Sequence, residues 1–403
     1  MPSLHPLFHF AQIGARDHYA WPRALHRTGL LGSLTTDFWS GSWPYSQIRN
    51  IRGRYHPELS QAPVNAWNTS ALITEAYWRL SQSSNWDEII RRNQYFQKNA
   101  LTRIPWDSMP VGRKPVLFAY SYAALDLLRE AKSRGWTTVL GQIDVGMFEH
   151  RLVCEQAELH PEFSPPASHP PPSYFGENWR KELELADYIV VNSKWSRNSL
   201  MAEGVAQSKT HLLPIPFETP EGQSKAKTYP EHFSPERPLR LLFLGQVSQR
   251  KGIVPLLQSM QEMRGESIEL TVAGPMRVRL PDWVHELPNV KFCGPVERLN
   301  VDQFYGSADL FILPTLSDGF GITQLEAQSR GLPIIASQRC GEVVRHGDNG
   351  YVLESPDKCQ LTRCLRTCLE SPGDLERWAA NSKVSEIFSF ERASSDLVRM
   401  LGS

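Results

Sequence analysis

Short apolar runs alternate with longer helix-like stretches along almost the whole chain. The runs are continuous in Val, Ile and Leu, which is typical of strands buried on both faces of a parallel sheet. A first series of predicted strands covers residues 7–13, 31–38, 116–120, 137–143, 188–191 and 211–215. A second series covers residues 239–244, 268–273, 290–293, 310–314, 333–337 and 351–353. The pattern predicts an α/β protein with two similar halves.

A polar segment separates the two series. Residues 218–238 are rich in Pro, Lys, Glu and Ser and almost free of aliphatic side chains, so they are the best linker candidate. We therefore expect an N-terminal domain over 1–217, a C-terminal domain over 239–388 and a final helical segment over 389–403.

Two segments of the first half depart from the α/β rhythm. Residues 40–115 carry helical patterns around 71–80 and 86–100, and residues 161–177 contain six prolines. So many prolines exclude a helix or a central strand, and we expect an irregular surface loop there.

Composition and charge exclude several classes of protein. The 403 residues carry 43 basic and 43 acidic side chains, so no global charge draws the chain to nucleic acid. No apolar run approaches the roughly 18 residues of a membrane span, although peripheral membrane contact stays open. The N-terminus lacks a basic signal-peptide region, and the six cysteines contain no CxxC motif. We expect a cytoplasmic protein with free thiols.

Several chemical signatures are absent. The chain has no GxxxxGK[ST] phosphate loop, no GxSxG elbow, no HExxH helix and no Asp-x-Asp pair. The first predicted strand leads into Gly14-Ala15-Arg16-Asp17 rather than GxGxxG, so a nicotinamide dinucleotide fold has little support. We expect no bound metal and no cofactor.

The densest chemical signal lies in residues 310–335. A predicted strand ends in the polar loop 317–321, and a helix is expected to begin near Ile322. Asp318 lies in this loop and Glu326 about one turn into the helix. The loop glycines let a ligand approach the backbone, whose free N–H groups suit an anion. The alternative is that Asp318 caps the helix and Glu326 is a surface acid.

A second signal follows the strand 239–244. Gly245 ends the strand, and Arg250-Lys251-Gly252 precede a helix expected over 253–263. Two adjacent cations between a strand and a helix can hold a diphosphate and neutralise it as it leaves. The alternative is a pair of solvated charges.

The order of these motifs resembles the nucleotide-binding domain of retaining GT-B glycosyltransferases of family 4 (glycosyl transferases group 1). The resemblance covers about 239–395 and rests on the Gly245…Lys251-Gly252 loop, strands ending in Gly274 and Gly294, the pair Asp318 and Glu326, and the stretch 341–351. Two positions depart from the family pattern. Asp318 stands in place of a glutamate, and Gln246 in place of a frequent arginine, whose charge Arg250 would supply.

The resemblance implies two Rossmann-like domains facing each other across a cleft, with the final helix crossing back onto the first domain. It implies metal-independent transfer of a sugar, with retention, from a nucleoside-diphosphate sugar to a sugar, glycan or lipid acceptor. Glu326 would bind the ribose, Asp318 the donor sugar, and Arg250 and Lys251 the leaving diphosphate. The donor pocket would be completed by loop and strand-end residues: Gly245, Gln246, Gly274, Gly294, Gly319, Phe320 and Gly321.

The first half matches the family less clearly. Gly14 lies in the loop position expected near the donor, and the family often places a histidine beside the donor sugar. His150 is our candidate, with a loop or capping histidine as the alternative, and Asp144 is either a cleft residue or part of a turn. The rival functions are an epimerase or phosphorylase on the same scaffold and a binding protein without turnover.

Overall fold

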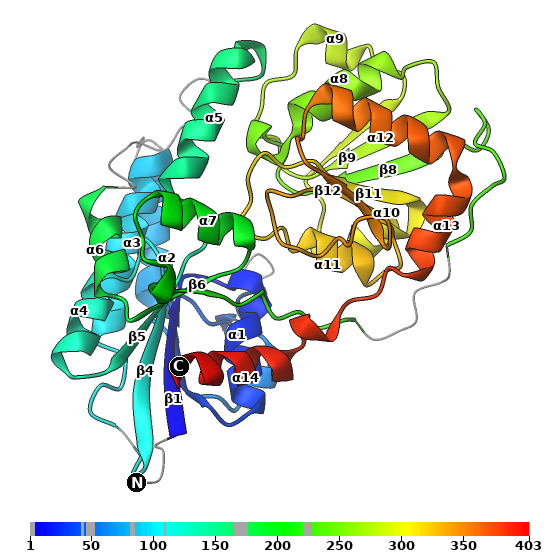
Figure 1. The fold of residues 1–403 in the computed structure, drawn as a ribbon. Coiled ribbons are helices and arrows are strands. Elements are labelled where there is room, and N and C mark those ends of the chain that lie inside the picture. Colours follow the sequence, from blue (N-terminus) through cyan, green and yellow to red (C-terminus); the bar gives the residue numbers. More distant parts are fainter. Residues whose placement is uncertain are drawn as a thin grey trace.

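A computed structural model describes residues 5–41, 44–45, 53–80, 85–108, 110–164, 176–220 and 227–402. The chain forms two α/β domains, each with helices on both faces of one parallel sheet (Figure 1). The fold class predicted from the apolar runs is therefore confirmed.

The N-terminal sheet has seven parallel strands in the order β3-β2-β1-β4-β5-β6-β7. The strands are β1 His5–Gln12, β2 Leu31–Thr36, β3 Val64–Asn65, β4 Arg113–Tyr120, β5 Thr137–Gly141, β6 Tyr188–Val191 and β7 Thr210–Leu212. Its helices are α1 Ala20–Arg27, α2 Asn68–Leu80, α3 Asn85–Leu101, α4 Leu125–Ser133, α5 Met147–Leu159, α6 Glu177–Leu185 and α7 Lys194–Ala202.

The C-terminal sheet has six parallel strands in the order β10-β9-β8-β11-β12-β13. The strands are β8 Leu239–Leu244, β9 Ile268–Ala273, β10 Val290–Gly294, β11 Leu310–Leu313, β12 Ile334–Ser337 and β13 Gly350–Leu353. Its helices are α8 Ile253–Glu262, α9 Asp282–His285, α10 Val301–Ser307, α11 Thr323–Gln328, α12 Lys358–Glu370 and α13 Pro372–Ala380.

All twelve predicted strands are present, and three of them, β6, β8 and β9, have the predicted bounds. Their apolar side chains form the cores on either side of each sheet, which is why continuous Val, Ile and Leu runs identified them. The patterns missed β3, because two residues are too short to show a period. Much of the proline-rich loop, 165–175, lies outside the described residues.

Strand order places the functional region of each domain. The chain starts each sheet in the middle, builds three strands to one side and then crosses to the other. The crossover points lie between β1 and β4 and between β8 and β11, and ligands of such sheets bind outside the carboxyl ends of the strands at these points.

The last helix, α14 Phe390–Leu401, lies against α1 of the first domain (Figure 1). Ala393, Leu397 and Met400 join the core of that domain, and the Arg23 guanidinium lies 4.8 Å from the centre of the Phe390 ring. The chain therefore returns from the second domain to close the first. None of the helices in the described part of the chain combines the length and apolar character of a membrane span.

Candidate active site

Two loops meet at the crossover point of the C-terminal sheet. The loop after β8 ends in a 3-10 helix, Gln249–Lys251, and the backbone carbonyl of Arg250 accepts hydrogen bonds from Leu316 N (2.8 Å) and Thr315 Oγ1 (3.0 Å). Gly252 allows this approach, since its φ is +76° and a Cβ there would lie 1.8 Å from the Pro314 carbonyl oxygen. The two loops thus bring Arg250 and Lys251 to Asp318.

A buried ion pair forms where the loops touch. Lys251 Nζ donates to Asp318 Oδ2, and Arg250 Nη1 lies 3.6 Å from Asp318 Oδ1. Burial favours the neutral acid, but Lys251 and Arg250 outweigh it and hold the pKa of Asp318 below its ordinary value. Asp318 is therefore ionised. The interpretation of Arg250 and Lys251 as solvated surface charges is wrong, because both are largely buried beside it.

The first domain adds two carboxylates to this pair. Glu149 Oε2, on α5, accepts a 2.7 Å hydrogen bond from Ser317 Oγ and lies 3.6 Å from Arg250 Nη1. Burial raises the pKa of Glu149 to about 7, against the opposing effect of Arg250. Asp144 accepts hydrogen bonds from Tyr122 OH (2.6 Å) and Gln142 Nε2 (2.9 Å), and burial raises its pKa as well. Three carboxylates thus surround two cations.

The two domains are in contact at this cluster. A Cβ at Gly319 would lie 2.6 Å from the carbonyl oxygen of Ile143, and Ser196 Oγ donates to the Gly319 carbonyl at 3.3 Å. Trp195 Nε1 donates to Ser317 Oγ at 3.0 Å. The loop 317–319 is therefore pressed between the loop after β5 and the start of α7, and the structure is closed here.

Glu326 occupies the predicted helix, now α11, and is half-buried. Its Oε2 accepts a 2.8 Å hydrogen bond from Tyr305 OH on α10, so the carboxylate is oriented by a neighbouring helix. Arg298, whose charge acts on Glu326, reaches across to His18 of the first domain, with 2.7 Å between Nη1 and Nε2. The exposed-acid interpretation of Glu326 is therefore wrong, while its role in ribose binding stays a prediction.

The predicted glycine positions have different surroundings. Gly245, Gly274 and Gly294 end three neighbouring strands, and Gly274 N donates to Gly294 O at 2.8 Å. A Cβ at Gly274 would lie 1.8 Å from the Gly245 carbonyl oxygen, so these strand ends are packed backbone to backbone. Gln246, next to them, is exposed.

In the loop 317–321, which the sequence predicts to bind an anion, some backbone N–H groups already donate hydrogen bonds within the protein. The N–H of Phe320 donates to the Asp318 carboxylate, and the Phe320 ring is buried against Phe388 at a centroid distance of 5.9 Å. Gly321 has a φ of +79°, which leads the chain into α11. The helix-capping alternative for Asp318 is wrong, because Ile322 is the N-cap of α11 and no side chain caps that helix. Asp318 instead accepts from the N–H of Phe320 and holds Lys251.

Two candidates of the first domain have other partners. Gly14 N donates to Asp37 Oδ1 at 2.8 Å, so its N–H is already used. His150 lies on α5 with Nε2 3.7 Å from Cys154 Sγ, while the preceding residue, Glu149, reaches the cation cluster. Sequence reasoning missed Glu149. The signal was present, because the residue lies just after the strand end that supplies Asp144.

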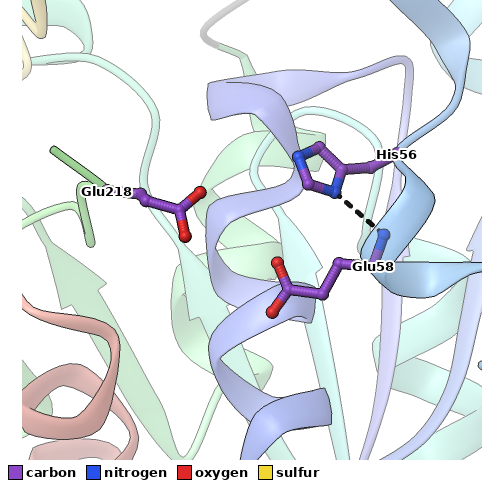
Figure 2. A group of neighbouring side chains, drawn as sticks. All are labelled: His56, Glu58 and Glu218. Carbon is purple, nitrogen blue, oxygen red and sulfur yellow. Dashed lines mark hydrogen bonds between the residues drawn. The ribbon is translucent and has the colours of Figure 1, made fainter. Parts of the chain in front are cut away.

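One group of side chains has the spacing of metal ligands. Figure 2 shows His56, Glu58 and Glu218, whose ligand atoms lie within 4.8 Å of one another. Both carboxylates already pair with Arg23 and Arg27. A cation would compete with two guanidinium groups, so the arrangement ties α1 to the segment after β7 rather than offering an open metal site.

Comparison with known proteins connects the second domain to a family. Residues 224–385 match the family of glycosyl transferases group 1. An uncharacterized glycosyltransferase of Methanocaldococcus jannaschii is 28% identical over 170 residues, which are 40% of this chain and 44% of the relative. A D-inositol 3-phosphate glycosyltransferase of a Nocardioides species is 27% identical over 185 residues, 40% of either chain. The matched part thus spans less than half of these relatives.

The similarity of fold extends over the whole chain. The crystal structure of Anabaena HepE in complex with UDP superimposes with a TM-score of 0.61 at 16% identity and covers 98% of this chain and 99% of that one. The architecture is therefore GT-B, with two Rossmann-like domains.

Proposed function

We propose that the protein is a glycosyltransferase that moves a sugar from a nucleoside-diphosphate sugar to an acceptor hydroxyl, without a metal ion and with retention of configuration. One observation carries this proposal. In a domain that matches glycosyl transferases group 1, the crossover point of the sheet holds two largely buried cations, Arg250 and Lys251, beside Asp318.

The donor would lie along the carboxyl edge of the C-terminal sheet. Glu326, oriented by Tyr305, would accept hydrogen bonds from the ribose hydroxyls. Arg250 and Lys251 would face the diphosphate. As the glycosidic bond breaks, negative charge grows on the leaving phosphate, and fixed cations in a site closed to water stabilise that charge strongly. The leaving phosphate would take the acceptor proton, which balances the transfer.

The carboxylate cluster bears on donor binding. In the closed structure Glu149 is paired with Arg250 and Asp318 with Lys251, so the two cations that a diphosphate would bind already have anionic partners. Because burial raises the pKa of Glu149 to about 7, this group takes up a proton near neutrality and then frees Arg250 for an anion. We propose that Glu149 leaves the cation when the donor binds.

The acceptor would approach from the first domain and would be a sugar, a glycan or a lipid headgroup. We keep the cytoplasm as the proposed location, because all six cysteines are free thiols, as a reducing compartment requires.

Activity with a panel of UDP-, GDP- and ADP-sugars tests the proposal. Release of nucleoside diphosphate should depend on added acceptor and survive EDTA. Activity that EDTA abolishes and Mn²⁺ restores would contradict the metal-free mechanism. Donor turnover without acceptor would favour an epimerase or phosphorylase, and tight binding without turnover would favour a binding protein.

Glu326→Ala tests the donor assignment separately. Loss of charge-assisted hydrogen bonds to the ribose should weaken nucleoside diphosphate binding by roughly 1.5–3 kcal/mol in calorimetry. Glu354→Ala, which removes an exposed carboxylate of the same domain, should bind as the parent does. Equal affinity in Glu326→Ala and the parent would show that Glu326 does not bind the ribose.

A further inference from the structure

A cavity of about 340 Å³ lies in the first domain between α3, α4 and α6. These helices cover the side of the sheet that lies away from α1 and α14 (Figure 1). The volume is at the lower end of the range, about 300–1,000 Å³, that small-molecule sites occupy. Of the side chains named in the site above, Tyr122 lines this cavity.

The lining is polar, and its buried carboxylate, Glu182, is already hydrogen-bonded to backbone N–H groups of α4 and the residue before it. Asn93 and Gln94 contribute amides from α3, and Asn178 contributes one from α6. Within the described part of the chain, no hydrogen bond uses the side-chain amides of these residues. Of the other charged lining residues, Asp126 and Arg129 pair with each other at 3.1 Å. Amides that both donate and accept suit hydroxyl groups, which do the same.

An anion is disfavoured in this cavity. The first turn of α4 faces it, but its N–H groups are already taken. Glu182 accepts from Ala124 N (2.8 Å) and Leu125 N (3.0 Å), and Gln97 Oε1 accepts from Asp126 N (2.9 Å). Because a buried carboxylate occupies the end of the helix where a phosphate would bind, the cavity favours a neutral ligand.

One wall of the cavity belongs to the candidate active site as well. Tyr122 lines the cavity and has a φ of +71°, a strained conformation for a residue with a side chain. Its N–H is held by Glu182 at 2.6 Å, and its OH donates to Asp144 at 2.6 Å. Strained residues persist where their surroundings hold them and are common at ligand sites. A ligand in the cavity would therefore touch the residue that orients Asp144.

We propose that this cavity binds a neutral polyhydroxylated ring, a sugar or cyclitol unit. That the ring belongs to the acceptor rests on the proposed function. The binding itself does not, because it involves neither the cations nor the nucleotide domain.

Saturation-transfer NMR on the full chain without nucleotide tests the proposal. The probes are methyl α-glucoside, methyl α-galactoside, methyl α-mannoside and myo-inositol, with glucose 6-phosphate as the anionic comparison. Asn93→Phe places an aromatic ring in the cavity, and Gln94→Met removes one amide at an exposed position. Gln207→Met, an exposed glutamine of the same domain outside the cavity, is the matched control.

At least one neutral probe should show saturation that falls fivefold or more in Asn93→Phe and Gln94→Met and persists in Gln207→Met. Silence of all neutral probes, preference for glucose 6-phosphate, or unchanged signals in both cavity variants would overturn the proposal. The thermal shift produced by UDP, GDP or ADP should be the same in all variants. If none of these nucleotides binds the parent, the proposed function fails while the cavity result stands.

Discussion

At the scale of single residues, the cluster of Arg250, Lys251 and Asp318 sets the cost of burying charges against the attraction between them. Removing water strengthens each attraction between opposite charges, and it also makes any unpaired charge costly. Removing the Lys251 side chain therefore takes away one of the two cations beside the Asp318 carboxylate. Substitutions here should act on the transition state as well as on the cluster.

We expect Lys251→Ala to lower kcat by at least two orders of magnitude, about 2.7 kcal/mol, because charge on the diphosphate grows in the transition state. Lys291→Ala, at an exposed lysine of the same domain, should leave steady-state kinetics unchanged. A kcat within threefold of the parent in Lys251→Ala would show that the lysine does not act on the leaving group.

Arg250→Ala should cause comparable damage, because we propose that Arg250, 3.6 Å from Asp318, supplies the charge that an arginine at position 246 would otherwise carry. Gln246→Arg in the Arg250→Ala background should then recover part of the kcat, since the exposed Gln246 borders the same strand end. If the kcat of the double variant is no higher than that of Arg250→Ala, Arg250 does not replace an arginine at position 246.

His9 links stability to pH. Burial of this residue of β1 lowers its pKa from 6.5 to about 4, and its Nδ1 lies 2.9 Å from Ser33 Oγ. The unfolded chain takes up this proton near pH 6.5 and the folded chain only near pH 4, so acid favours unfolding across that window. The parent should lose about 3 kcal/mol between these pH values through His9 alone.

Thermal unfolding measured from pH 7 to pH 4 checks this effect. His9→Gln should flatten the decline, while His285→Gln, at an exposed histidine, should follow the parent. Parallel curves for His9→Gln and the parent would show that another group controls the acid sensitivity.

At the scale of secondary-structure elements, the position of the cations depends on how α8 begins. Gly252 is the residue before α8, in a left-handed conformation against the carbonyl of Pro314. A side chain there must displace the loop after β8, the loop after β11, or both. Gly252 thus lets the loops that follow two neighbouring strands, β8 and β11, touch each other.

Gly252→Ala should therefore weaken nucleoside diphosphate binding at least tenfold in calorimetry and lower stability by more than about 1 kcal/mol. Gly265→Ala is the matched control, since its Cβ would meet no atom within 4 Å and its φ is not positive. Unchanged binding in Gly252→Ala would mean that the two loops can separate without moving the cations.

At the scale of the whole molecule, contacts between the domains determine which charges surround Arg250 and Lys251. Glu149 comes from the first domain, and its partners Arg250 and Ser317 belong to the second. Opening the cleft separates them. On the proposed function, closure and donor binding are therefore coupled through one carboxylate.

This coupling predicts a pH dependence with a definite sign. Below pH 7 Glu149 is mostly protonated, and above pH 7 its negative charge competes with a diphosphate for Arg250. We therefore compare the affinity of Glu149→Gln for nucleoside diphosphate with that of the parent. The ratio of the two affinities should rise as the pH increases from 6 to 8, by at most roughly tenfold per pH unit. Glu162→Gln, at an exposed glutamate, should track the parent in calorimetry. A constant ratio between Glu149→Gln and the parent would exclude competition.

Local sequence is enough to predict most of the secondary-structure elements and the motifs of the second domain. Strands such as β8 and β9 are encoded by local apolar runs, and Asp318, Arg250 and Lys251 lie within short loops beside them. Periodicity and the order of motifs are local properties, so a single sequence displays them. Their roles in catalysis stay predictions.

Only the tertiary structure brought residues from distant segments together. Glu149 meets Ser317 although 168 positions separate them, and Glu182 holds the first turn of α4 from α6. A glutamate on a helix is usually a solvated surface residue, so the sequence does not show what either glutamate binds, although Glu149 does lie shortly after the strand end that supplies Asp144. Burial, which raises the pKa of Glu149 to about 7, arises only when the two domains pack. The apolar pattern specifies which faces are buried, but the partners of a buried charge depend on the folded chain.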